Sequence, residues 1–164
     1  MPTFASEAER REILDYFSGR FGIPEKAFEG FCFLKGERKI WVVQDHPELE
    51  RILEQLKVES AGIPLLRTKP SMWKPTTAGL HFFGRHATRN VIDLDGDVLW
   101  AFLNRESIEG PFSLEPGFVI VRWRGKVLGC AVYGKGRLRS QIPEKRGEPF
   151  RGKADAEETG GLSG

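Results

Sequence analysis

The sequence contains no long apolar run, and this absence excludes a membrane-spanning helix. No segment approaches the roughly 20 consecutive apolar residues that such a helix needs, and residues 1–11 are too charged for a signal peptide. Only two cysteines, Cys32 and Cys130, occur among 164 residues, which excludes a disulfide framework and a zinc-finger pattern. We therefore expect a soluble, cytoplasmic protein with no membrane partner and no bound metal.

Residues that commonly carry out catalysis are also scarce. The three histidines, His46, His81 and His86, have no carboxylate at a motif spacing, and no serine-hydrolase, phosphate-loop or zinc-protease motif occurs. His81 precedes two phenylalanines, and we expect it, with Phe82, in or beside the core. Both cysteines lie inside apolar strand segments, where burial raises the pKa of a thiol and makes it a poor nucleophile. The sequence thus predicts a protein that is not an enzyme and needs no cofactor.

Charge is present in quantity and is unevenly distributed. The chain carries 25 basic and 23 acidic side chains, a formal net charge of +2. Residues 1–62 carry 9 basic and 12 acidic side chains, residues 63–150 carry 14 and 8, and residues 151–164 carry 2 and 3. A basic half next to an acidic half is typical of proteins whose basic part contacts nucleic acid. Ordinary solvated lysines and arginines explain the same counts equally well.

The pattern of the first 62 residues predicts a compact αββα unit. The whole chain contains 12 phenylalanines and 4 tryptophans, enough large apolar side chains for a core. Ser6 followed by Glu9 forms a capping box that starts a helix, which we expect to stop at Gly19. The further elements expected are strands at 31–34 and 40–43 and a helix after the capping pair Asp45 and Glu48, ending at Gly62.

Residues 63–148 predict a second domain, a small and partly open β barrel with one helix, because several short strands follow one another. The expected strands are 64–68, 90–94, 118–123, 127–133 and 137–140, with a helix capped by Asp95. The tail, residues 149–164, is polar and glycine-rich, and we expect it to be disordered. The fold class predicted for the whole chain is α+β.

Two clusters of cations stand out within the second domain. Residues 61–92 contain no Asp or Glu, while Arg and Lys accumulate. The second cluster runs from Arg122 to Arg146, with Glu144 as its only acid. Because alternate residues of a strand share a face, Arg137 and Arg139 are expected to point outward, as are Arg122 and Arg124 if their strand continues to the turn. Local positive charge without compensation is what phosphate binding requires.

The segment GFVIVRWRGKVLGCAVYGKGRLRSQIPEKRGE (117–148) resembles the C-terminal half of PUA and PUA-like RNA-binding domains, in particular those of the Sun-family (RsmF-like) ribosomal RNA cytosine-C5 methyltransferases. KPTTAGLHFFGRHATRNVIDLD (74–95) and WAFLNRESIEG (100–110) resemble the helices and second strand of that domain. RFGIPEKAFEGFCFLKGERKIWVV (20–43) resembles the small domain that precedes it. The resemblance implies a PUA-like mixed β pseudo-barrel after a pre-PUA domain.

The chain departs from that family in what it lacks. It has no segment resembling the S-adenosylmethionine domain and no cysteine in the family's Pro-Cys or Thr-Cys context. The resemblance therefore implies a non-catalytic protein that recognises structured ribosomal or transfer RNA, in ribosome biogenesis or RNA modification. Because the sequence begins with Met1 and a capped helix, we expect a free-standing protein. The alternative is a protein-interaction module whose acidic N-terminal unit docks a separate RNA methyltransferase or a ribosomal protein.

The resemblance also implies where RNA would bind. PUA domains use the first helix with its following strand and the last strand, which correspond here to residues 74–91 and 135–146. These segments largely coincide with the two cation clusters. The RNA-binding candidates, two of them at the rim, are Lys69, Lys74, Arg85, His86, Arg89, Lys135, Arg137, Arg139, Lys145 and Arg146.

Overall fold

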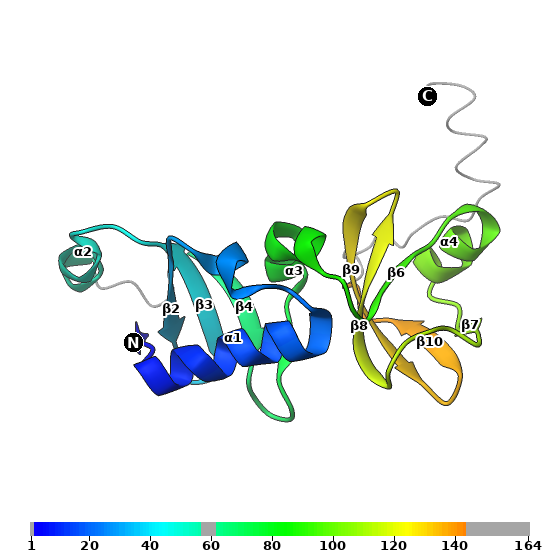
Figure 1. The fold of residues 1–164 in the computed structure, drawn as a ribbon, viewed down its shortest axis with the longest axis horizontal. Helices are drawn as coiled ribbons and strands as arrows, with labels where there is room; N and C mark the ends of the chain where they lie inside the picture. The colour runs from blue at the N-terminus through cyan, green and yellow to red at the C-terminus, as the bar shows by residue number, and fades with distance from the viewer. Residues whose placement is uncertain (1, 57–61, 144–164) are drawn as a thin grey trace, which may run out of the picture. The chain divides into compact units, whose positions relative to one another are not determined.

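The computed structural model describes residues 2–56 and 62–143. The chain divides into two compact units, Met1–Arg89 and Asn90–Gly164, here called unit 1 and unit 2. Each has its own sheet and its own helices (Figure 1). Within the described residues, no helix is both long and apolar enough to cross a membrane, and no group of three or more His, Cys, Asp or Glu side chains is placed to hold a metal ion.

Unit 1 is built on a five-stranded antiparallel sheet whose strands follow one another in sequence order. Its strands are β1 (Thr3–Phe4), β2 (Phe31–Lys35), β3 (Lys39–Gln44), β4 (Ile63–Arg67) and β5 (Lys74–Pro75). Its helices are α1 (Glu7–Phe21), η1 (Glu25–Phe28), α2 (Leu49–Leu56), α3 (Thr77–Phe83) and η2 (Gly84–His86). Helix α1 lies across one face of strands β2, β3 and β4 (Figure 1).

The capping box at the start of α1 is confirmed. The Ser6 hydroxyl accepts the Glu9 backbone N–H at 3.1 Å, and the Glu9 carboxylate accepts the Ser6 N–H at 2.9 Å. The predicted stop at Gly19 is wrong, because the helix continues to Phe21 and ends at Gly22 in the left-handed conformation with φ +65°. At the start of α2, Nδ1 of His46 accepts the backbone N–H of Glu48 at 3.0 Å.

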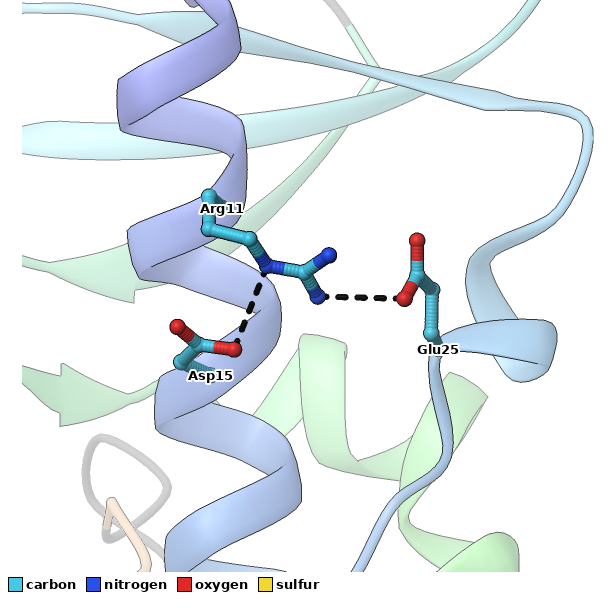
Figure 2. Close-up of polar contacts among 3 residues, drawn as sticks. All are labelled: Arg11, Asp15 and Glu25. Carbon is cyan, nitrogen blue, oxygen red and sulfur yellow. Dashed lines mark hydrogen bonds and ion pairs between the residues drawn. The ribbon is translucent and has the colours of Figure 1, made fainter.

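Helix α1 is tied to the 3₁₀ turn η1 by one arginine. The Arg11 guanidinium donates from Nε to Asp15, one turn further along the helix, at 3.2 Å. Its Nη2 donates to Glu25 of η1 at 3.1 Å (Figure 2). All three side chains are exposed, so the contact orients η1 more than it stabilises the fold.

The core of unit 1 is aromatic. Phe28, fully buried, packs against Phe17 at 5.4 Å and against Phe83 of α3 at 4.5 Å between ring centroids. Phe82 is not in the core as predicted: 47% of it is exposed, and its ring packs edge-on against Phe31. A seven-residue helix presents only one face to the sheet, and Phe83 occupies that face. His81 is likewise exposed.

The compact units of the structure divide between Arg89 and Asn90, whereas the boundary expected from the sequence lies at Gly62 and stays a prediction. Strand β4 pairs with β3, with Leu66 opposite Ile40, so the residues after Gly62 complete the first sheet. The backbone N–H groups of Thr88 and Arg89 both donate to the Phe21 carbonyl, at 2.8 and 3.0 Å. A local pattern predicts the strand at 64–68, but its pairing with β3 depends on residues more than 20 positions earlier in the sequence.

The new boundary changes the distribution of charge. Residues 1–89 carry 14 basic and 12 acidic side chains, and residues 90–164 carry 11 of each. The acid-free stretch that made the second half basic belongs almost entirely to unit 1. Neither unit has a large net charge, so any argument for an anionic partner must rest on local clusters.

Unit 2 contains a mixed sheet that curls into a half-barrel, with strands in the order β6-β8-β9-β10-β7. Strand β6 pairs in parallel with β8, and the other neighbours are antiparallel. The strands are β6 (Val91–Asp93), β7 (Ile108–Glu109), β8 (Gly117–Trp123), β9 (Lys126–Gly134) and β10 (Arg137–Ser140), and the helix is α4 (Gly96–Leu103). The predicted α+β class, with a pseudo-barrel in the second domain, is confirmed.

The core of unit 2 forms between α4 and the sheet, where Phe102 and Leu138 are fully buried beside Val119 and Val121. The first residue of the unit, Asn90, is buried with φ +49°. Its side-chain oxygen accepts the Glu115 backbone N–H at 2.8 Å, and its carbonyl accepts the Ile120 N–H at 2.9 Å. These bonds fix the start of the parallel strand.

Candidate nucleic-acid interface

Strand β10 directs two arginines outward. Arg137 and Arg139 are exposed, whereas Leu138 between them is 0% exposed and packs in the core of unit 2. The two-residue period of a strand gives this alternation. The orientation predicted for the pair is confirmed.

The turn before β10 adds a third cation. Lys135 and Gly136 join β9 to β10 as a two-residue hairpin loop, with φ +52° and +73°. Two consecutive positive φ values define a type I′ turn, which matches the twist of the flanking strands. The Lys135 side chain is exposed at this turn.

These three cations line a hollow of about 530 Å³, here called the basic hollow. Among the residues that the structure describes, its lining consists of Ser107, Gly134, Lys135, Arg137 and Arg139, none of which is acidic. Ser107 comes from the segment between α4 and β7 and was not a candidate from the sequence. Its hydroxyl can both donate and accept hydrogen bonds. A hollow with this lining offers charge and directed donors to an oxyanion.

One acidic residue lies near the basic hollow. Glu109 of β7 stands directly opposite Arg137 of β10, and its carboxylate forms an ion pair with Arg137, with Oε1 3.4 Å from Nη2. Both side chains are mostly exposed, so the ion pair contributes about 0–1 kcal/mol. Within residues 2–56 and 62–143, no acidic partner lies within ion-pair distance of Lys135 or Arg139. Their charge is therefore available to an anion.

The expectation that Arg122 points outward into solvent is wrong. Its Nη2 donates to Asp93 at 3.0 Å, and most of its side chain is covered. Asp93 also accepts the backbone N–H of Gly125 at 3.4 Å. The parallel pairing of β6 with β8 places Asp93 opposite Arg122. Arg122 therefore holds the β8–β9 turn against β6, while Arg124 lies over the Trp123 ring at 5.1 Å.

The structure places the first predicted cluster in unit 1. Lys69, Arg85 and Arg89 are exposed, and Lys74 and His86 are half-buried. Arg85 Nε donates to Nε2 of His86 at 3.2 Å within η2. The two clusters thus belong to different units. The remaining candidates, Lys145 and Arg146, lie outside the described residues.

Lys69 lies among carboxylates. It lines a hollow of about 300 Å³ together with Glu9, Glu12, Glu37 and Lys35. The Glu9 carboxylate accepts a hydrogen bond from the Lys35 ammonium, which, with the Ser6 backbone N–H, lowers the pKa of Glu9 from 4.5 to about 2. Glu9 is therefore ionised at neutral pH. Nearby negative charge weakens the case for Lys69 as a phosphate contact.

The cysteines keep the environment predicted for them. Cys130 is buried in β9, and Cys32 is half-buried in β2. Burial, followed by the nearby Asp45 carboxylate, raises the pKa of the Cys32 thiol. A raised pKa leaves little thiolate at neutral pH, so Cys32 has none of the activation that a nucleophile needs.

Comparison with protein families gives two matches, the first of which ends at Gly62 and the second of which begins close to the division between the two units. Residues 89–146 match the model of the PUA domain of methyltransferase RsmF, and residues 3–62 match a family of unknown function, DUF7122. A search of curated proteins gave no match. Residues 89–146 therefore form a PUA-like domain as in RsmF-type methyltransferases. No methyltransferase catalytic domain was found, and a PUA domain suggests RNA binding in a methyltransferase-related context.

The matched region begins at Arg89, which is later than the resemblance in the sequence implied. Residues 74–88, expected to form the first PUA helix, precede the match and lie in unit 1. Of the two candidate clusters, the one formed by Lys135, Arg137 and Arg139 lies within the PUA-like domain.

Proposed function

We propose that the chain is a non-catalytic RNA-binding protein that recognises structured ribosomal or transfer RNA, and that it acts in ribosome biogenesis or RNA modification. The observation that carries the proposal is the basic hollow, because it gathers three cations within the PUA-like domain. The polyanionic backbone is the general source of affinity for RNA.

In this proposal the lining residues have different roles. Arg137 and Arg139 donate bidentate hydrogen bonds to phosphate oxygens, as the planar guanidinium favours. Lys135 provides a point charge, and the Ser107 hydroxyl donates to the same phosphate or to a ribose 2′-OH. Lys145 and Arg146, which follow β10 in sequence and lie outside the described residues, are proposed as further RNA contacts from their charge alone.

The remaining candidates, Lys74, Arg85, His86 and Arg89, are proposed as secondary contacts. They come from unit 1. Arg85 and His86 shortly precede the PUA-like domain in sequence, and Arg89 is the first residue of the matched region. Lys69 is the weakest candidate, because the carboxylates around it repel phosphate.

The test is affinity for a fluorescently labelled ribosomal RNA hairpin and for a transfer RNA, measured with the full chain over a range of salt concentrations. The double variant Arg137→Gln/Arg139→Gln should weaken binding roughly tenfold and reduce the slope of log K against log salt by about 0.7–0.9 per lost contact. Glu109→Gln serves as the control of opposite sign, because it removes a negative charge beside the same hollow. It removes the acidic neighbour of Arg137 and should strengthen binding a few-fold.

Unchanged affinity in both variants would overturn the proposed site. No detectable binding of either RNA by the unmodified chain at any salt concentration would overturn the function. In that case, capture of a methyltransferase or ribosomal protein without RNA would favour the protein-interaction alternative.

A further inference from the structure

Three cationic side chains stand side by side on neighbouring strands of unit 1. Lys39 of β3 is directly opposite Arg67 of β4, and Arg67 is directly opposite Lys74 of β5. Residues directly opposite on antiparallel strands share a face and have Cβ atoms about 4.5–5.5 Å apart. We call these three residues the cation row.

The next residues along the strands identify the face on which the row lies. Ile40, Leu66 and Pro75 also stand opposite one another, and all three are buried. Since successive side chains of a strand point to opposite faces, the cation row lies on the face away from that buried row. Arg67 is exposed there, and Lys39 and Lys74 are half-buried.

The row is electrostatically unfavourable in the free protein, because like charges directly opposite on neighbouring strands repel. Elsewhere in unit 1, cations such as Lys35, Arg11 and Arg51 each contact a glutamate. Across the described part of the chain, by contrast, no carboxylate is found within ion-pair distance of Lys39 or Arg67.

An aromatic ring supports one end of the row. The Lys39 ammonium lies 5.5 Å from the centroid of the Trp41 ring, on the same strand. A cation–π contact restricts the lysine side chain without neutralising it. Arg67 and Lys74 belong to the acid-free stretch of residues 61–92. The row therefore combines repulsion with partial ordering of Lys39, and two of its three cations come from a stretch without Asp or Glu.

We infer that the cation row binds phosphates of an RNA backbone, so that unit 1 provides a second RNA contact separate from the basic hollow. The inference rests on the proposed function for the identity of the polyanion. Because both sites belong to one chain, binding at one raises the effective concentration of the same RNA at the other. Bound phosphates would also relieve the repulsion within the row.

The test uses the full chain and the same labelled RNA hairpin. Lys39→Gln/Arg67→Gln should weaken binding roughly tenfold at physiological salt and lower the salt slope by about 0.7 per lost contact. Because the substitution removes repulsion, the melting temperature of the free variant should be equal to or above that of the unmodified chain. Lys26→Gln/Arg51→Gln removes the same charge from exposed positions of unit 1 outside the row, and should leave affinity nearly unchanged.

The outcomes separate this inference from the proposed function. If only Arg137→Gln/Arg139→Gln weakens binding, the basic hollow stands and the cation row is overturned. If only Lys39→Gln/Arg67→Gln weakens binding, the row stands and the hollow is overturned. Equal losses in the row and control variants would show a general charge effect and overturn the row. A polyglutamate peptide that displaces RNA from the unmodified chain but not from the row variant would identify an acidic protein as its ligand and overturn the inference.

Discussion

At the scale of single residues, the conformation of Lys135 connects structure with function. Hairpin loops of type I′ favour Asn, Asp or Gly, because both central residues need positive φ. Here a lysine with φ +52° occupies the first position, next to two arginines that line the same hollow. Lysine is less favourable than Asn, Asp or Gly at this backbone conformation, but it places a cation in the basic hollow.

Lys135→Asn should therefore separate stability from binding. The substitution relaxes the turn and should raise the free energy of unfolding by about 0.5–1 kcal/mol, measured by urea denaturation. It should weaken RNA binding and lower the salt slope by about one contact. Arg124→Asn makes the same change in the other type I′ turn, where φ is +49°, and should leave RNA affinity unchanged. A loss of affinity as large in Arg124→Asn would contradict the assignment.

The sequence predicts residues of the candidate site only where a local rule applies. The strand period is enough to place Arg137 and Arg139 outside and Leu138 inside. Ser107 reaches the same hollow from a distant segment, which no local pattern indicates. In the sequence, Arg122 has the same expected orientation as Arg137 and Arg139. The parallel pairing of β6 with β8 places Asp93 opposite Arg122, and the two side chains form an ion pair.

At the scale of elements, the end of α1 also depends on a contact between segments that are distant in the sequence. Gly19 and Gly22 are both reasonable helix stops in the sequence. In the structure, Gly22 has φ +65° and its N–H donates to the Ser18 carbonyl, while a Cβ at this position would collide with the Thr88 hydroxyl. A Cβ at Gly19, within the helix, meets no atom within 4 Å. Contact with a segment more than 60 residues away thus selects the stop.

Alanine substitutions at the two glycines should have opposite effects. Gly22→Ala should lower the free energy of unfolding of unit 1 by about 2 kcal/mol, because it introduces left-handed strain and a clash. Gly19→Ala should raise it by about 0.5–1 kcal/mol, as expected for alanine replacing glycine inside a helix. Thermal or urea unfolding followed by circular dichroism measures both. A stabilised Gly22→Ala variant would contradict the helix end described here.

Most elements of both units follow from local patterns, but their assignment to sheets does not. The extended segment expected at 64–68 corresponds to β4, whereas α3 is not among the helices expected from local patterns. Whether β4 pairs with β3 or joins the later strands depends on the total burial of Leu65 and Leu66 within unit 1. Sequence patterns indicate which face of a strand is apolar. They do not indicate which neighbouring strand it pairs with, because several strands of the chain could cover the same apolar face.

At the scale of the whole molecule, the division between Arg89 and Asn90 revises the meaning of the net charge. A boundary at Gly62 makes one half acidic and the other basic. The observed units are nearly balanced, with 14 basic and 12 acidic side chains up to residue 89 and 11 of each beyond it. The case for an RNA partner therefore depends on small arrangements of cations, each formed by a strand or a turn.

This balance has a consequence for kinetics. Two nearly neutral units produce a weak field beyond the Debye length of about 8 Å at physiological salt, so RNA is not steered toward the protein from a distance. The association rate constant should change little with salt, and the dissociation rate constant should carry most of the salt dependence. Stopped-flow mixing with labelled RNA measures both, and an association rate that falls steeply with salt would contradict this expectation. Such a protein meets RNA by unaided diffusion and discriminates by how long each RNA stays bound.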